Sequence, residues 1–147
     1  MANKTEFEGK TTRNGTWLEV WINDEYCAEV ESFKIEVNIT YTDVNKARSL
    51  MADKKMTKLD GKVTIKTHKT RDSLQHYIME EVKKGKVPIL SVVGKVDDPD
   101  SDGIVDVACK KCYPNKATLL DAEVGKLAEE SIECDMGELP DFIDYVA

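Results

Sequence analysis

The segment Phe33-Lys34-Ile35-Glu36-Val37-Asn38-Ile39-Thr40-Tyr41-Thr42 specifies the architecture of this chain more clearly than any other. Its odd positions are apolar and its even positions are polar, a period of two that is typical of a β-strand with one buried and one wet face. Residues 62–68 alternate in the same way, because Val63 and Ile65 lie between polar neighbours. The two segments predict a pair of long strands that share a polar face.

Shorter β-rich segments surround this pair. Asn23-Asp24 follows the first of them, and because both side chains tolerate positive φ, this dipeptide predicts a tight hairpin. Gly94 lies inside another, where glycine marks a bulge or a close approach of a neighbouring group. The additional strands are predicted in residues 16–22, 89–96, from 104 onward, 118–122 and 131–135.

Only residues 71–84 have the apolar spacing of an amphipathic helix, with Leu74, Tyr77, Ile78 and Val82 on one face. Gly85 suits the left-handed position that ends a helix. Many strands with one helix predict a mainly β fold with one α-helix (α+β). We expect two packed antiparallel β-sheets that form a sandwich or barrel, with the helix covering one side.

The length of 147 residues fits one domain, 1–147. Residues 1–15 are polar and predict an extended N-terminal arm. Residues 42–60 are rich in Lys and Asp and lack an apolar period, so they predict a long inter-strand loop. No internal repeat or linker divides the chain.

Composition excludes several functional classes. Lys and Arg number 21 and Asp and Glu 28, a net charge of −7 without a basic stripe, which disfavours a nucleic-acid-wrapping protein. No apolar run is long enough for a membrane anchor. The first 14 residues lack the apolar core of a secretory signal, so we expect synthesis in the cytosol and four free cysteines rather than disulfides.

Two motifs suggest metal binding, and both are incomplete. Asp98-x-Asp100-x-Asp102-Gly103 matches the first half of an EF-hand loop, but Cys109 stands where the bidentate Glu is needed. Cys109-x-x-Cys112 is half of a zinc site without a second close pair. No nucleophile or phosphate-loop motif accompanies His68 or His76. The sequence therefore assigns no catalytic, cofactor-binding or metal-binding residue.

Four stretches, taken in order, resemble the tail tube (inner tube) protein of contractile phage tails, in the form found in PBSX-like prophages and R-type bacteriocins. They cover most of the chain, and their order and spacing carry the resemblance. They are Gly15-Thr-Trp-Leu-Glu-Val-Trp-Ile-Asn-Asp-Glu, Val30-Glu-Ser-Phe-Lys-Ile-Glu-Val, Gly61-Lys-Val-Thr-Ile-Lys leading to Tyr77-Ile-Met-Glu-Glu-Val-Lys-Lys-Gly85, and Lys116-Ala-Thr-Leu-Leu-Asp-Ala-Glu-Val with Leu127-Ala-Glu-Glu-Ser and Leu139-Pro140.

The resemblance implies a non-enzymatic structural protein without cofactors, with a fold similar to the type VI secretion inner-tube protein. Its subunits form hexameric rings that stack into a hollow tube, and contraction of a surrounding sheath drives the tube through a target envelope. The implied partners are further copies of the chain, the sheath protein, and baseplate and tail-terminator proteins. DNA passes through the lumen only if the parent particle is a phage. The final location is the tube of a released phage tail or bacteriocin particle.

Under this interpretation, the polar strand face lines the lumen and the long loop bridges successive rings. The lumen candidates are Lys34, Glu36, Asn38, Thr40, Lys62, Thr64, Lys66 and His68. The inter-ring candidates are Asp43, Lys46, Arg48, Met51, Lys54, Met56 and Lys58. Two alternatives stay open: a small metal- or ligand-binding β-barrel built around the Cys pair or the Asp-rich turn, and a hydrolase, which no nucleophile motif supports.

Overall fold

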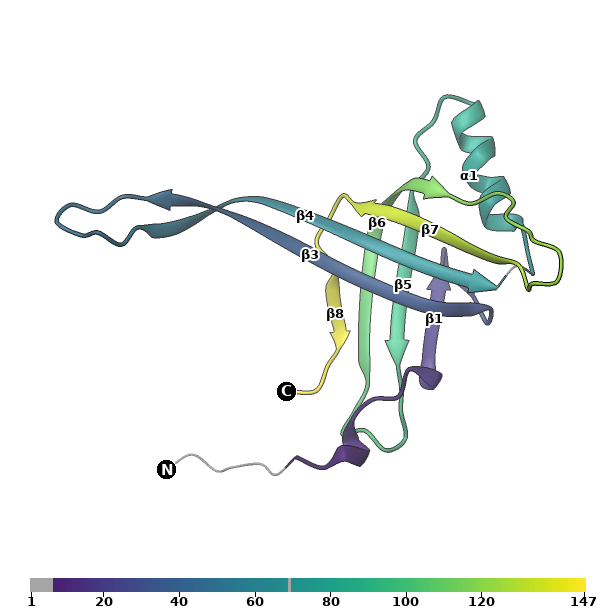
Figure 1. Cartoon of the computed structure of the whole chain (residues 1–147), viewed down its shortest axis with the longest axis horizontal. Helices are drawn as coiled ribbons and strands as arrows, with labels where there is room; N and C mark the ends of the chain where they lie inside the picture. Colours follow the sequence, from purple (N-terminus) through teal and green to yellow (C-terminus); the bar gives the residue numbers. More distant parts are fainter. Residues whose placement is uncertain (1–6, 69) are drawn as a thin grey trace.

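The computed structural model describes residues 7–68 and 70–147. Residues 1–6 of the predicted N-terminal arm lie outside this part, and short 3₁₀ turns follow at Gly9–Thr11 and Gly15–Trp17. The remaining elements are β1 (Leu18–Ile22), β2 (Glu25–Tyr26), β3 (Val30–Val44), β4 (Asp53–His68), α1 (Ser73–Lys83), β5 (Leu90–Val96), β6 (Val105–Ala117), β7 (Glu129–Met136) and β8 (Asp141–Asp144) (Figure 1).

All described strands belong to one open antiparallel sheet in the order β2-β1-β5-β6-β7-β4-β3, with β8 added to β6. The mainly β fold with one helix is confirmed, but two separate sheets are not. The reason is the length of β6, whose first part pairs with β5 and β8 and whose last part pairs with β7. Hydrogen bonds therefore continue around the bend, and the β3-β4-β7 part crosses the β1-β5-β6 part (Figure 1).

The core lies between these two parts of the sheet. Val63 and Ile65 of β4 are fully buried, as the alternation predicts, and Ile78 of α1 packs on the same cluster. The other core residues, from β1, β5, β6 and β7, are Val20, Ile22, Leu90, Val92, Cys109, Cys112, Ile132 and Cys134. Burial of these apolar side chains is the main favourable term in folding.

Gly94 is a point of close approach, as its position in a strand predicts. A Cβ atom built on Gly94 would lie 2.3 Å from Cε1 of Phe33, so the ring of Phe33 occupies the space of the missing side chain. This contact joins β5 to the N-terminal part of β3 across the core.

The predicted turn and helix boundaries are also observed. Asn23 and Asp24 have φ of 52° and 64° and join β1 to β2. Gly85 has φ of 73° just after α1, which is the left-handed conformation expected there.

Two predicted segments differ from the structure, and β8 is a strand that the alternation does not predict. The loop 42–60 is largely strand, since β3 continues to Val44 and β4 begins at Asp53, which leaves a turn at 45–52. These strand ends are exposed on both faces, so no apolar alternation signals them. Residues 118–122 form no strand, because the pairing of β6 with β7 ends at Ala117. The apolar segment 139–146 adds β8 to the edge of β6, with its large side chains exposed.

Candidate functional site

The β3–β4 ladder brings the eight predicted lumen residues onto one face. Lys34 lies opposite Thr64, Glu36 opposite Lys62, and Asn38 opposite Asp60. Lys66 and His68 continue the same face of β4 beside β7. Of these eight side chains none is buried, and the Lys34 ammonium lies 2.7 Å from the Glu36 carboxylate. The sequence thus identified a real, contiguous polar surface.

Strand β7 extends this surface with residues beyond the eight that the sequence predicts. Glu129, Ser131, Glu133 and Asp135 lie opposite alternate residues of β4 and face the same side. Lys66 bonds Glu129 at 3.2 Å. The sequence signal for these β7 residues is the alternation in 131–135, where the apolar residues Ile132 and Cys134 are buried. The widened surface carries charges of both signs.

One group on this surface has the donors of a metal site. Glu31, His68 and Glu129 are the only cluster in the described part of the chain whose ligand atoms all lie within 4.8 Å of one another. Glu129 is already ion-paired with Lys66, and Glu31 and His68 are exposed to water. A cation here would compete with the ammonium group for the same carboxylate.

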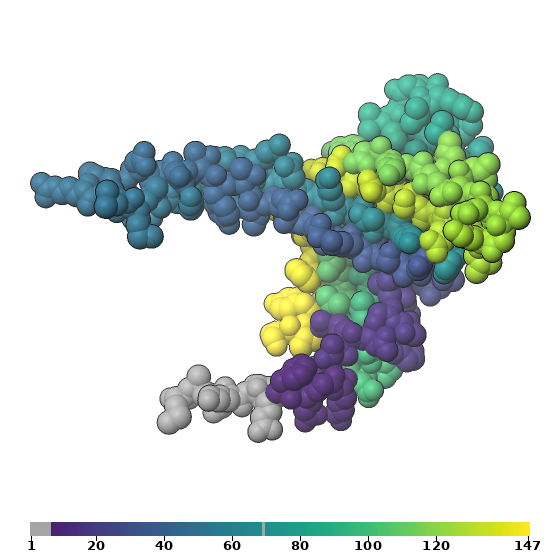
Figure 2. All heavy atoms as spheres, in the orientation of Figure 1, coloured from purple at the N-terminus to yellow at the C-terminus, as the bar shows by residue number. Residues whose placement is uncertain are grey.

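The seven inter-ring candidates lie on a β-hairpin that projects from the body of the molecule (Figures 1 and 2). Lys46 pairs with Asp53 at 3.1 Å, Lys58 with Asp60 at 3.5 Å, and Lys54 with Asp43. Met56 lies opposite Tyr41, Arg48 has φ of 61° in the turn, and Met51 is exposed there. They lie on a paired ribbon and its short turn instead of the predicted loop.

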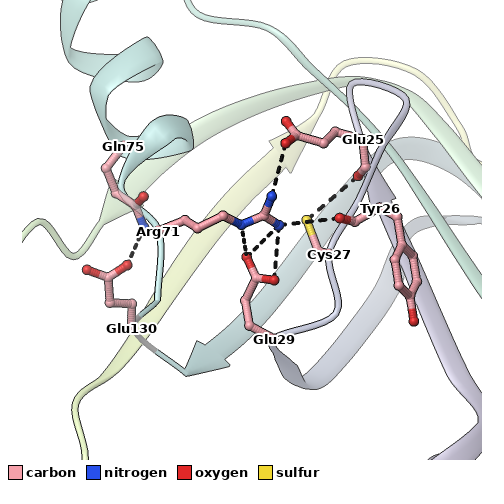
Figure 3. A network of polar contacts seen from close by, with 7 residues as sticks. All are labelled: Glu25, Tyr26, Cys27, Glu29, Arg71, Gln75 and Glu130. Carbon is pink, nitrogen blue, oxygen red and sulfur yellow. Dashed lines mark hydrogen bonds and ion pairs between the residues drawn. The ribbon is translucent and has the colours of Figure 1, made fainter.

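A cavity of about 250 Å³ lies between α1, β2 and the adjoining strands. Arg71 dominates it, because its Nε and Nη2 donate to the Glu29 carboxylate at 2.9–3.1 Å and its Nη1 donates to Glu25 at 3.0 Å (Figure 3). The hydrogen bonds to Glu29 raise the pKa of Arg71. The guanidinium is therefore occupied by carboxylates, and the network ties the start of α1 to the β2 hairpin.

The cysteines behave as small buried apolar groups. The Sγ atoms of Cys109 and Cys112 are 3.1 Å apart in the core, and a bulge between the β5–β6 pairs Leu90–Cys112 and Val92–Cys109 turns both inward. Burial raises the pKa of Cys134 to about 12 and also raises the pKa of Cys112. These two thiols stay protonated at neutral pH, and within the described residues no third close ligand completes a site with the Cys pair.

The Asp-rich turn is held together by hydrogen bonds between the Asp98 carboxylate and backbone N–H groups. The two carboxylate oxygens of Asp98 accept hydrogen bonds from the backbone N–H groups of Asn14 and Asp100 at 2.8 and 2.9 Å. Ser101 Oγ donates to the carbonyl oxygen of Asp98 at 2.7 Å. Asp98 therefore fixes the turn and the incoming N-terminal segment.

Comparison with known proteins agrees with this geometry. A model of the phage tail tube protein family matches residues 5–141, and no curated protein matches the sequence. Within the described residues, no helix is long and apolar enough to cross a membrane.

Solved structures share the fold at low sequence identity. A chain of an extracellular contractile injection system sheath/tube terminator is 10% identical, with a TM-score of 0.69 over 96% of this chain and 100% of that one. A chain of the anti-feeding prophage tube-terminating cap is 11% identical, with a TM-score of 0.66 over 97% and 95%. A chain from a gene transfer agent virion is 14% identical, with a TM-score of 0.61 over 90% and 100%. On the family match, which spans nearly the whole length, this chain belongs to the phage tail tube proteins, a family of structural tail components.

Proposed function

We propose that the chain is the structural subunit of the inner tube of a contractile tail or R-type bacteriocin. Six copies form a ring, rings stack into a hollow tube, and a sheath encloses the tube and drives it through a target envelope on contraction. Baseplate and terminator proteins complete the two ends of the tube. Assembly takes place in the bacterial cytoplasm before the particle is released.

The observation that carries this proposal is the long β3–β4 ribbon. From Glu36 to Asp60 every side chain is exposed except that of Ala52, and the distal half has no layer packed on either face. A two-stranded ribbon in water is marginally stable at best. Strand β3 also leaves its outer edge unpaired over 15 residues, which a lone protein has to guard. Contact with further copies would cover the exposed ribbon and protect the unpaired edge of β3.

The polar face is suited to line the lumen. Its residues carry both charges, side by side, and all retain access to water in the single chain. A mixed, hydrated wall avoids a large field of one sign. The turn 45–52 at the end of the ribbon is the element that would reach an adjacent ring.

Electron microscopy of the purified full-length chain at high concentration tests the proposal. We expect six-fold rings that stack into tubes without added metal. Rings that never stack would indicate a terminator, the role named for two of the similar structures. A monomer that carries stoichiometric zinc or calcium would contradict the tube function and favour a metal-binding barrel.

Hydrogen exchange gives a second prediction. In the free subunit, amides of residues 36–44 and 53–60 should exchange much faster than those of β4 beside β7, because only one ladder and no packing protects them. In assembled tubes the ribbon should become strongly protected, while the core strands change little. Equal and strong protection of the ribbon in both states would contradict a role for it in assembly.

A further inference from the structure

The two ends of the long axis of the molecule differ in chemistry (Figures 1 and 2). The hairpin turn forms one end. The loop 118–128 forms the other, where β3 and β7 begin and β4 ends. Side chains at these two ends are exposed to solvent. The two ends carry surplus charges of opposite sign, and both expose apolar side chains.

The hairpin end is basic. Residues 42–60 contain five basic and three acidic residues, a net charge of +2, so the rest of this chain of net charge −7 carries −9. Lys46, Lys54 and Lys58 each pair with an aspartate of the same ribbon. Arg48 and Lys55 are left without a carboxylate partner in the described part of the chain, and they account for the excess of two.

The opposite end is acidic. Among the described residues, its cations Lys66, Arg71 and Lys126 already pair with Glu129, with Glu25 and Glu29, and with Glu123. Asp121 of the loop remains, and it has no lysine or arginine within salt-bridge distance in residues 7–68 and 70–147. Surplus positive charge at one end and surplus negative charge at the other favour association of identical chains in one direction.

Both ends also expose apolar side chains. On the ribbon, the apolar face of β3 and β4 that covers the core at Phe33 continues outward as Val37, Ile39, Tyr41, Met56 and Leu59, which are 37–56% exposed. On the loop, Leu119 is 48%, Leu120 81%, Leu127 88% and Val124 fully exposed. Grouped apolar side chains of this size on a soluble protein mark a contact surface.

We propose that the apolar, basic ribbon of one copy docks on the 118–128 loop and the acidic end of a second copy. This inference rests on the proposed tube function and names the receiving surface. Because the two patches are different parts of the same chain, the contact is heterologous and repeats head to tail, and in the tube it joins one ring to the next. The loop side chains would cover the ribbon face that the single chain leaves in water.

Charge exchange tests the pairing directly. One variant carries Arg48→Glu with Lys55→Glu, and the other carries Asp121→Lys with Glu123→Lys. Each variant alone should lose tubes, as measured by sedimentation and microscopy, because its contact between rings places like charges together. An equimolar mixture should assemble again, and so should a single chain that carries all four changes. The control Lys84→Glu with Lys86→Glu makes the same change in net charge as the ribbon variant, at exposed sites away from both ends, and it should assemble alone.

The outcomes separate this inference from the tube function. Unchanged melting temperatures of all variants show that the subunit is folded. If the ribbon variant assembles like the parent chain, or if neither the mixture nor the four-fold variant recovers, the ribbon does not dock on this loop, although the tube function stands. If the parent chain itself never oligomerises, the tube function fails and this inference with it.

Discussion

The Val63→Asp variant is expected to yield little or no folded protein at neutral pH, whereas Lys62→Gln should fold and melt like the parent chain. Val63 is fully buried between Ile35 of β3 and Cys134 of β7. Asp is close to Val in volume, so the substitution mainly introduces a charge. An unpaired charge in the core costs about 3–5 kcal/mol, a large share of the roughly 5–15 kcal/mol that holds a typical domain together.

The pH dependence distinguishes the charge from a change in shape. Burial would raise the folded-state pKa of the new carboxyl above its unfolded value of about 4. An acid with a raised folded-state pKa lowers stability as pH rises through the unfolded value, so the deficit of Val63→Asp should shrink as pH falls toward about 4. Urea unfolding at pH 5, together with the fraction of folded protein at pH 7 by circular dichroism, measures this difference.

Lys62 is the matched control, because it is the adjacent residue and lies on the exposed polar face. Surface substitutions of this kind usually change stability by about 0.5 kcal/mol or less. If Lys62→Gln unfolds the protein and Val63→Asp is tolerated, then the register of β4 is shifted by one residue, and the polar face is not the face described above.

The sequence predicts the body of the fold well because local pattern and burial coincide there. Val63 and Ile65 alternate with polar residues because one face of β4 covers the core. Beyond Glu36, the ribbon is exposed on both faces in the single chain. Its β4 half therefore lacks the alternation, and the sequence predicts a loop there. A strand whose covering layer belongs to another molecule leaves a weak signal in its own sequence.

Partner choice between distant strands is the other feature that local pattern does not contain. The bend of β6 joins what the alternation suggests as two sheets into one. Cys112 shows the same limit: it has the parity of the exposed face relative to buried Cys109, yet the bulge between them turns it inward. For the candidate site, the β3 and β4 residues could be predicted, whereas their continuation on β7 required knowledge of the strand order.

The Gly94→Ala variant is expected to lose about 1–3 kcal/mol, the usual cost of overpacking a core. The new Cβ would lie 2.3 Å from Cε1 and 2.9 Å from Cδ1 of Phe33, closer than real side chains approach. Gly94 is paired on both sides, with Val20 of β1 and Val107 of β6, so the backbone cannot withdraw without breaking a ladder. The Phe33 ring has to move instead. For a domain of this size the loss corresponds to a fall in melting temperature of roughly 3–10 °C.

A double-mutant cycle identifies the contact responsible. Phe33→Leu removes the ring atoms that the new methyl group would meet, so Gly94→Ala should cost less in the Phe33→Leu background than in the parent chain, by about 1 kcal/mol or more. Gly15→Ala is the control, because nothing lies within 4 Å of a Cβ there and its φ is not positive. Without a clash, replacing Gly by Ala stabilises a protein by about 0.4–1 kcal/mol through the unfolded chain, so the two alanine variants should shift the melting temperature in opposite directions. If Gly94→Ala costs the same in both backgrounds, the Phe33 ring does not fill this space, and the root of the ribbon is held to β5 in some other way.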